Sequence, residues 1–596
     1  MKNTSTIALL LLGLMGFIAI NSIKNDSATT DEAPHITSGY AYLKLQDLRL
    51  NPEHPPLLKD IAAFPLLFMD LNFPYQNIAW TQMVNAQWNL APEFLYNSGN
   101  NADEIIFWGR TGPILLMLLF GWFVFRWSSK LFGDKWGLFC LSLFVFSPDI
   151  MAHGRLITTD TPAAFAFLSA IYFYIKLLKS PTNKNLIIFG VVFAIAQLTK
   201  FSLLFLFIFL PLITILWIIT ANRTVNVLSR PVISDLFAWI LRFCKIFLIS
   251  LAIITVVYHF HIINYPIEKQ IEDISHILSD EKLFTLKETL VWMADKPLLR
   301  GLAQYVLGAS MVFLRVQGGS TAYFLGETSA QSWFYYFPVV FILKVPAAVL
   351  VFIALSAILF LKSILTNLRN RNSLHDFTKN NFDELAMLLF VSFYWVISIN
   401  TNLNIGIRHI LPSFPFIYIL IAGQLKRWLN SARIAEAKTP ILLLENLPTS
   451  VFSTTGKTFL IASLVMMNAA TFVMAYPHYL SYFNIFSGGS DNAYKYVVDS
   501  NLDWGQDLKR LAQFVEENNI NQIKVDYFGG GNVKYYLGDK AILWNSNNGE
   551  TTGWIAVSAT YYQTSRAYAG FSYEWLDKYE PVKKIGHSIF VYNIEH

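Results

Sequence analysis

The feature that most constrains this chain is a series of long apolar segments with few charged residues. About 20 consecutive apolar residues are enough for an α-helix to cross the hydrocarbon core of a bilayer. Segments of this kind lie at residues 6–22, 106–126, 134–151, 161–179, 185–199, 202–221, 244–261, 334–361, 384–400, 409–425 and 456–475. Hydrophobic residues make up 54% of the 596-residue chain and charged residues 14%, below the average of about 25% for soluble proteins. We therefore expect an all-α polytopic membrane protein with about 11 transmembrane helices.

Two of these apolar regions differ from a simple crossing. The run from 185 to 221 is too long for a single span, and Lys200 interrupts it. Because a lysine inside the bilayer is costly, we predict two short helices that meet at the membrane surface, where Lys200 then lies. The first segment follows Lys2, and no small-residue cleavage pattern stands before Asn25. It is interpreted as an uncleaved first span and not as a signal peptide.

The distribution of Lys and Arg predicts the side of the membrane on which each loop lies. Short cytoplasmic loops of membrane proteins carry an excess of basic residues. Five loops show this excess, with Arg126, Lys130 and Lys135; Lys176, Lys179 and Lys184; Arg223, Arg230, Arg242 and Lys245; Lys362, Arg369, Arg371 and Lys379; and Lys426, Arg427, Arg433 and Lys438. The other side then receives the first outer loop 23–105, the turn 152–160, Lys200, the long outer loop 262–333, the turn 401–408 and the tail from 476. Residues 301–314 are interpreted as an interfacial or re-entrant helix within the long outer loop.

The remaining composition argues against several classes of protein. The net charge of +5 needs no nucleic-acid partner, because cytoplasmic loops of membrane proteins collect Lys and Arg. Cys140 and Cys244 lie in hydrophobic segments without metal-ligand spacing, so neither a disulfide framework nor a zinc site is expected. The expected partners are membrane lipids and molecules linked to lipids.

The tail differs in composition from the rest of the chain. We divide the chain into a transmembrane domain, 1–475, and an extracytoplasmic α/β domain, 476–596. Residues 503–519 have the apolar spacing of a helix, and 523–528, 553–559 and 589–594 are typical of short strands. The three glycines at 529–531 lack the lysine and the helix start of a phosphate-binding loop, so a plain turn is predicted there.

Ionisable residues gather at the ends of the outer loops: Asp31, Glu32, Arg155, Asp160, Lys200, Arg408 and His409. Each could simply cap a helix or extend to water at the membrane surface. Together, acids and cations suit the transfer of a sugar from a phosphate leaving group. A carboxylate removes the proton of the acceptor hydroxyl, and positive groups stabilise the charge that develops on the phosphate. A lipid phosphate carrier could reach such a site through the bilayer.

Several motifs in this order resemble those of a known family. They are D-E at 31–32, H-P-P-L-x-K at 54–59, R-L-x-x-x-D at 155–160, L-T-K at 198–200, Y-F-x-x-x-F-x-L-K-V-P at 336–346, G-I-R-H-I-L-P at 406–412, Y-L-S-Y-F-N at 479–484 and D-S-N-L-D-W-G-Q-D-L at 499–508. The chain resembles the bacterial family 39 glycosyltransferases, which are relatives of protein O-mannosyltransferases and of the lipid A aminoarabinose transferase. This resemblance implies the C-type glycosyltransferase (GT-C) fold and a polyprenyl-phosphate-linked sugar donor. It also implies a place in the bacterial cytoplasmic (inner) membrane. The side predicted from the basic residues then gives a cytoplasmic N-terminus and a periplasmic C-terminus.

The resemblance further implies roles for single residues. Asp31 matches the acid that activates the acceptor as general base, with Glu32 beside it, and Asp160 matches the acid of the second outer loop. The residues expected to bind the donor phosphate are Arg155, Lys200, Arg408, His409 and Lys59, and those expected to shape the pocket are His54, Pro55, Pro56 and Lys344. No cofactor is firmly implied, although Asp31, Glu32 and Asp160 could hold a divalent cation. Nothing in the tail resembles the luminal repeat domain of the mannosyltransferases, so lipid, glycan and protein acceptors all stay open.

The sequence thus predicts a membrane glycosyltransferase that moves a sugar from a polyprenyl-phosphate carrier to an acceptor at the outer face of the membrane. Two alternatives stay open. A transporter or flippase of lipid-linked sugars would place charges at mid-membrane depth and show repeat symmetry between its halves, neither of which is visible in the sequence. A ligase or polymerase would take a diphosphate-linked oligosaccharide in place of a monophosphate donor.

Overall fold

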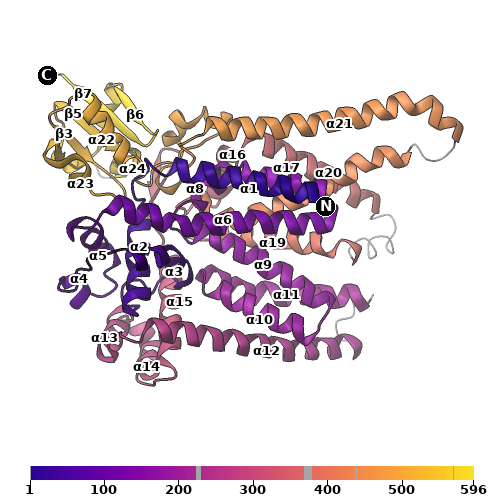
Figure 1. The fold of residues 1–596 in the computed structure, drawn as a ribbon, viewed down its shortest axis with the longest axis horizontal. Helices are drawn as coiled ribbons and strands as arrows, with labels where there is room; N and C mark the ends of the chain where they lie inside the picture. Colours follow the sequence, from indigo (N-terminus) through magenta and orange to yellow (C-terminus); the bar gives the residue numbers. More distant parts are fainter. Residues whose placement is uncertain (1, 223–229, 368–378, 436–439, 568–569, 596) are drawn as a thin grey trace.

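The computed structural model describes residues 2–222, 230–367, 379–435, 440–567 and 570–595. Long helices lie side by side, and a smaller domain with a β-sheet covers one end of them (Figure 1). Helices dominate the bundle because a helix satisfies its own backbone N–H and C=O groups inside a bilayer. The structure confirms the predicted helical polytopic fold and the small C-terminal α/β domain.

Eight helices in the described part of the chain are long and apolar enough to cross a membrane. They are α1 (Lys2–Ser22), α6 (Ala102–Phe132), α9 (Asp160–Lys179), η4 (Phe201–Phe205) continued by α11 (Leu206–Asn222), α12 (Arg230–His261), α17 (Ala347–Asn367), α19 (Phe382–Ile399) and α21 (Pro440–Met474). A ninth crossing would be α7 (Asp134–Val145) together with α8 (Pro148–Gly154), which are bent by 65° relative to each other. The other two predicted segments fall on the shorter apolar helix α10 (Asn183–Gln197) and on η6 (Ile407–Ser413) with α20 (Phe414–Ala435).

Two breaks interrupt long apolar segments, and only one of them was predicted. The break predicted at Lys200 is confirmed, because α10 ends at Gln197 and η4 begins at Phe201. The single span predicted at 334–361 is wrong, because α16 (Tyr336–Lys344) and α17 are separate helices. Val345 between them has an extended backbone (φ −66°, ψ 134°), as expected for a residue whose helical conformation is disfavoured by a following proline.

The first outer loop is largely helical and has a core of its own. Its elements are α2 (Glu32–Tyr40), η1 (Ala41–Leu45), α3 (Leu57–Ala63), η2 (Phe64–Phe68), α4 (Ile78–Thr81), α5 (Gln87–Pro92) and η3 (Glu93–Asn97). Ile36, Tyr40, Leu90 and Phe94 are buried together in this core. The helix that begins after Asp31 is therefore packed into this core.

The long outer loop is also folded. It forms α13 (Ile267–Ile277), η5 (Glu281–Leu283), α14 (Phe284–Ala294), α15 (Arg300–Gly318) and an antiparallel pair of strands, β1 (Ala322–Phe324) and β2 (Glu327–Ser329). The segment interpreted as interfacial or re-entrant lies in α15, which is not among the candidate spans.

A mixed five-stranded sheet organises the C-terminal domain. The strand order is β4 (Ala541–Leu543), β3 (Ile523–Asp526), β5 (Gly553–Ser558), β7 (Ile589–Ile594) and β6 (Lys583–Ile585). β3 is parallel to β4 and β5, whereas β7 is antiparallel to β5 and β6. The helices of the tail are α22 (Leu508–Glu517), α23 (Val533–Leu537), α24 (Ala559–Thr564) and the short η7 (Ile485–Ser487), η8 (Ser490–Lys495), η9 (Asp499–Asn501), η10 (Gly538–Lys540), η11 (Ser546–Asn548), η12 (Ser565–Ala567) and η13 (Tyr573–Lys578). The predicted helix and three predicted strands are confirmed, and β4 and β6 are additional.

The two outer loops and the C-terminal domain lie at the same end of the bundle (Figure 1). In Figure 1, α2 to α5, α13 to α15 and the sheet are grouped there, and the N-terminus points away from them. This is the relative placement predicted from the basic residues. Of those residues, Arg223, Arg369, Arg371 and Lys438 lie outside the described residues, as do the side chains of Arg230 and Arg433.

Backbone hydrogen bonds join the C-terminal domain to the first outer loop. The N–H groups of Ser27 and Thr30 donate to the carbonyl oxygens of Gln506 and Trp504, both at 3.0 Å. The hydroxyl of Ser27 also donates to the carbonyl oxygen of Gly505 at 2.7 Å. The segment directly before Asp31 is therefore paired with a segment that lies far away in the sequence.

The turn predicted at 529–531 supplies a further contact of this kind. The N–H of Gly530 donates to the carbonyl oxygen of Ala28 at 3.2 Å. A Cβ atom at position 530 would lie 2.3 Å from the carbonyl oxygen of Thr29, closer than atoms can approach. Glycine is thus required here by close contact between two backbones, and not by phosphate binding.

We expect Gly530→Ala to weaken the attachment of the C-terminal domain to the first outer loop. Overpacking of a tight contact costs about 1–3 kcal/mol, so the thermal unfolding midpoint of the purified protein should fall. Gly13→Ala is the matched control, because a Cβ at that position in α1 meets no atom within 4 Å. Equal midpoints for the two variants would contradict a tight contact at Gly530.

Candidate active site

Asp31 and Glu32 are adjacent in the sequence but lie in different environments. Asp31 immediately precedes α2, and its side chain is 25% exposed, whereas the side chain of Glu32 is fully buried. The N-terminus of a helix carries partial positive charge that favours a carboxylate. Of the two acids, Asp31 is the one that a ligand can reach.

The carboxylate of Glu32 is saturated by buried donors. Arg110 donates to it from Nε at 2.8 Å and from Nη2 at 2.6 Å. The backbone N–H groups of Thr29 and Ile157 donate to it at 2.9 and 3.0 Å. A buried charge is tolerated when it is paired and hydrogen-bonded in this way. Glu32 therefore ties the start of the first outer loop to α6 and to the turn 152–160.

Arg110 is a site residue that the sequence analysis does not name. Besides Glu32, it donates to the carbonyl oxygens of Ile23, Asp26 and Ser27 at 3.3, 3.0 and 2.9 Å. The sequence could have indicated its role, because Arg110 lies in the predicted span 106–126. An arginine inside a span is costly unless it has a partner.

Arg408 lies between the two acids of the outer loops. Its Nη1 donates to Asp31 Oδ2 at 2.7 Å and lies 3.5 Å from Asp160 Oδ2. Lys200 Nζ donates to the other oxygen of Asp160 at 2.6 Å. The guanidinium of Arg408 covers the ring of Trp504, with 4.2 Å between Cζ and the ring centroid. Asp31, Arg408, Asp160 and Lys200 together are called the charged cluster below.

Buried polar atoms beside the charged cluster have no hydrogen-bond partner among the described residues. They include Arg408 Nε and His409 Nε2. His409 is fixed through its backbone, because the hydroxyl of Tyr394 donates to its carbonyl oxygen at 3.0 Å. Since buried polar atoms are normally hydrogen-bonded, unpartnered ones mark a place where a polar ligand can bind.

Arg155 belongs to a second ionic network. Its Nη2 lies 2.9 Å from Asp26 Oδ2, and Arg510 contacts the other oxygen of Asp26 at 2.6 Å. Arg510 also donates to Asp507 at 2.6 Å. The network links the turn 152–160, the first outer loop and the C-terminal domain. No contact between Arg155 and the charged cluster occurs in the described part of the chain.

Lys59 is buried beneath the H-P-P turn. Its Nζ donates to the hydroxyl of Tyr42 at 3.0 Å and to the carbonyl oxygens of Asn51 and His54 at 2.9 and 2.8 Å. Burial lowers the pKa of Lys59 well below its ordinary value, although the charge of Asp60 raises it in part. These three bonds use all three N–H groups of the ammonium, so Lys59 holds the turn in place.

The H-P-P turn is joined to the segment that carries Lys200. Pro56 precedes α3, and the N–H of Leu57 donates to the carbonyl oxygen of Leu198 at 3.2 Å. The ring of His54 packs edge-on against that of His35, with 5.2 Å between centroids. His54 and the two prolines, Pro55 and Pro56, therefore lie beside the segment that carries Lys200.

Lys344, at the end of α16, is fully buried. Like Lys59, it donates to backbone carbonyl oxygens of neighbouring segments. Its Nζ donates to the carbonyl oxygens of Leu480 and Asn501 at 2.9 and 2.6 Å, and it lies 3.8 Å from Asp149. Lys344 thereby joins α16 to both tail motifs, Y-L-S-Y-F-N and D-S-N-L-D-W-G-Q-D-L.

No group of three or more His, Cys, Asp and Glu side chains that could hold a metal ion occurs among the residues that the structure describes. The three acids named as possible cation ligands each contact a cationic side chain. Asp31 and Asp160 contact Arg408, and Glu32 contacts Arg110.

A protein-family model matches part of the transmembrane region. Residues 102–257 match the family model described as dolichyl-phosphate-mannose-protein mannosyltransferase. This match confirms the resemblance to family 39 glycosyltransferases that the motifs indicate. No curated protein sequence matches the chain.

Solved structures that are similar to this chain share little of its sequence. ArnT from Cupriavidus metallidurans, in its crystal structure bound to undecaprenyl phosphate, is 11% identical over 98% of each chain, with a TM-score of 0.45. The apo oligosaccharyltransferase of Archaeoglobus fulgidus is 11% identical over 96% of this chain and 72% of its own, also with a TM-score of 0.45.

We expect Glu32→Ala to destabilise the protein by about 3–5 kcal/mol, because it leaves the charge of Arg110 buried without its partner. Asp31→Ala is the comparison variant, since Asp31 is partly exposed and its loss should cost less. Thermal unfolding of both purified variants measures the difference. A midpoint for Glu32→Ala equal to that of the unmodified protein would show that the buried pair does not hold the loop.

Proposed function

We propose that this protein transfers a sugar from a polyprenyl-phosphate carrier to an acceptor at the end of the bundle that carries the outer loops. The single observation that carries the proposal is the charged cluster, in which Arg408 lies between an accessible acid, Asp31, and the pair of Asp160 with Lys200. The family model supports a lipid-phosphate donor through the dolichyl-phosphate-mannose of its description.

Asp31 acts as the general base in this proposal. Its Oδ2 accepts a hydrogen bond from Arg408, which stabilises the ionised carboxylate and fixes its position. The acceptor hydroxyl gives its proton to this carboxylate while its oxygen forms a bond to the anomeric carbon of the sugar. The acceptor oxygen approaches from the face opposite the phosphate, and the electron pair of the breaking bond goes to the phosphate oxygen. The configuration at the anomeric carbon is therefore inverted.

Arg408 and Lys200 stabilise the polyprenyl phosphate that leaves. Both side chains are partly exposed, at 10% and 18%, and both already contact carboxylates that can release them toward a phosphate. Preorganised cations in a site that excludes water are effective at stabilising developing negative charge. His409 lies next to them, and its unpartnered Nε2 is available for a phosphate oxygen. Arg155 and Lys59, by contrast, do not bind the phosphate in this proposal. Arg155 pairs with Asp26, and Lys59 bonds to the backbone of the H-P-P turn.

The charged cluster also bears on the two alternatives. A flippase would move the whole lipid-linked sugar without breaking a bond, and it would need no general base. A ligase or polymerase would show the same chemistry with a diphosphate donor, so a comparison of monophosphate and diphosphate donors separates it from our proposal.

We expect Asp31→Asn to lower the turnover of a polyprenyl-phosphate sugar donor by about a hundredfold or more, because the amide cannot accept the proton. The measurement is transfer or release of labelled sugar by the purified full-length protein. Asp70→Asn is the matched control, because Asp70 is an exposed acid of the same outer loop.

Two outcomes would contradict this proposal. One is near-normal turnover by Asp31→Asn. The other is movement of the lipid-linked sugar across liposomes without transfer, which would favour the flippase.

A further inference from the structure

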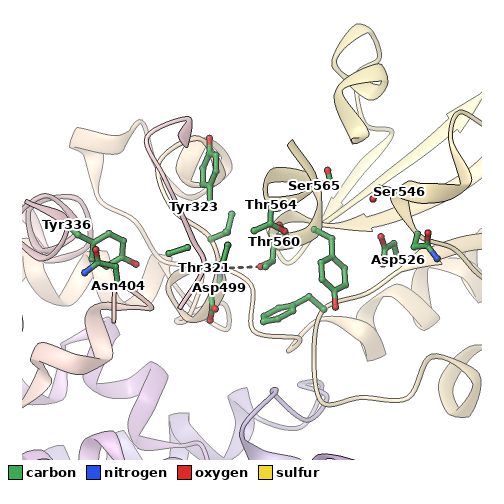
Figure 2. Close-up of a pocket in the computed structure, with 15 residues that line it drawn as sticks. Thr321, Tyr323, Tyr336, Asn404, Asp499, Asp526, Ser546, Thr560, Thr564 and Ser565 are labelled. Atoms are coloured by element: carbon green, nitrogen blue, oxygen red, sulfur yellow. Dashed lines mark hydrogen bonds between the residues drawn. The ribbon is translucent and has the colours of Figure 1, made fainter. Parts of the chain in front are cut away.

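A cavity of about 460 Å³ lies between the long outer loop and the C-terminal domain. Figure 2 shows that it extends from Tyr336 and Asn404 at one end to Asp526 and Ser546 at the other. Residues from both sides contribute to its lining, so the cavity exists only when the C-terminal domain is attached. It is large enough for a small organic ligand.

The lining of this cavity combines apolar and polar groups but carries no positive charge. Hydroxyl groups come from Thr321, Ser546, Thr560, Thr564 and Ser565. No Lys, Arg or His occurs among the described residues that line it. A phosphate or carboxylate would enter without a charged partner, so the cavity does not suit an anionic ligand.

Carboxylates and aromatic rings supply the rest of the recognition chemistry. Asp499 and Asp526 both line the cavity and can accept hydrogen bonds from ligand hydroxyls. Tyr323, Phe528 and Tyr561 offer rings against which the C–H face of a pyranose can pack. Hydroxyls, carboxylates and rings in one cavity are the groups that bind a neutral sugar.

Asn404 provides a specific donor at one end of the cavity. Its side chain is 2% exposed, and its Oδ1 accepts from the N–H of Trp333 at 2.7 Å. Its Nδ2 is buried and has no hydrogen-bond partner among the described residues. A buried amide nitrogen of this kind is expected to bind a ligand oxygen or water.

The cavity adjoins the charged cluster through two short segments that are bonded to each other. Ile407 N donates to Asn501 Oδ1 at 2.9 Å, and the hydroxyl of Ser500 donates to the carbonyl oxygen of Ile405. Asn404 and Arg408 lie on the first segment, and Asp499 lies on the second.

Asp499 lines the cavity and also interacts electrostatically with Arg408 and Asp31 of the charged cluster. Burial raises the pKa of Asp499 to about 6, while the positive charge of Arg408 lowers it and the negative charge of Asp31 raises it. Its backbone lies in the left-handed region (φ 57°), and its N–H donates to Thr560 Oγ1 at 3.1 Å. Strained conformations of this kind cluster at functional sites.

We propose that this cavity binds the acceptor, and that the part of the acceptor bound there is an uncharged sugar unit rather than a phosphorylated one. The inference rests on the proposed function, because the cavity is assigned to the acceptor through its connection to Asp31. An acceptor sugar held between Asn404, Asp499 and Tyr561 presents a hydroxyl toward the charged cluster.

The test is binding of small saccharides to the full-length protein in lipid nanodiscs without glycoside detergents. The probes are the methyl glycosides of glucose, galactose, mannose and N-acetylglucosamine, and the 6-phosphate of each, measured by saturation-transfer NMR titration. At least one neutral glycoside should bind, and its 6-phosphate should bind about tenfold more weakly or not at all.

Two substitutions test whether the saccharide binds in this cavity. Tyr561→Ser should weaken it about tenfold, and folding should be retained because Tyr561 is 38% exposed. Tyr535→Ser, at a tyrosine that is 41% exposed on the same domain and does not line the cavity, should leave it unchanged.

Three results would overturn the inference. They are tighter binding of the phosphorylated probes, no binding by any neutral probe, or equal binding by Tyr561→Ser and Tyr535→Ser. Donor turnover measured on the same preparation separates the two proposals. Turnover without saccharide binding leaves the proposed function intact and removes the inference, whereas binding without any turnover removes the proposed function and the acceptor role with it.

Discussion

The arrangement of the charged cluster depends on one buried ion pair, between Glu32 and Arg110. Glu32 is buried with Arg110, and five hydrogen bonds from Arg110, Thr29 and Ile157 saturate it. Taking both charges out of water costs several kcal/mol for each ion, so the pair persists only while its hydrogen bonds are complete. Those bonds require α6, the turn 152–160 and the start of the first outer loop to meet at one point. Asp31, one residue earlier, is positioned as a result, and it remains accessible because Glu32 occupies the buried position.

The helical framework could be predicted from the sequence because hydrophobicity and length decide which helices can cross a bilayer. The break at Lys200 followed from the same physics, since a lysine cannot remain in hydrocarbon without a partner. The break between α16 and α17 at Val345 was missed because the apolar run 334–361 is long enough for one span, and the proline near its centre was not taken as a helix boundary. β4 and β6 were missed because each has only three residues, too few for a periodic pattern.

The site was predicted only in outline. Charges at the ends of apolar segments identified Asp31, Asp160, Lys200 and Arg408, and the structure brings these four together. The sequence could not distinguish the accessible Asp31 from the buried Glu32, or show that Lys59 and Arg155 bind other parts of the protein. These distinctions depend on contacts between distant parts of the chain. Arg408 and Asp31, for example, are 377 residues apart in the sequence. Local patterns carry no information about them.

The pairing of Thr30 with Trp504 has a consequence for how the protein is made. Trp504 also lies beneath Arg408, so this one residue supports both sides of the charged cluster. The ribosome completes the first outer loop and all the long apolar helices before it reaches residue 504. Until then, the nascent chain contains Asp31 and Arg408 but lacks the surface on which they meet. A chain that ends before residue 504 therefore lacks both the ring beneath Arg408 and the backbone partner of Thr30, and these supports are added late in synthesis.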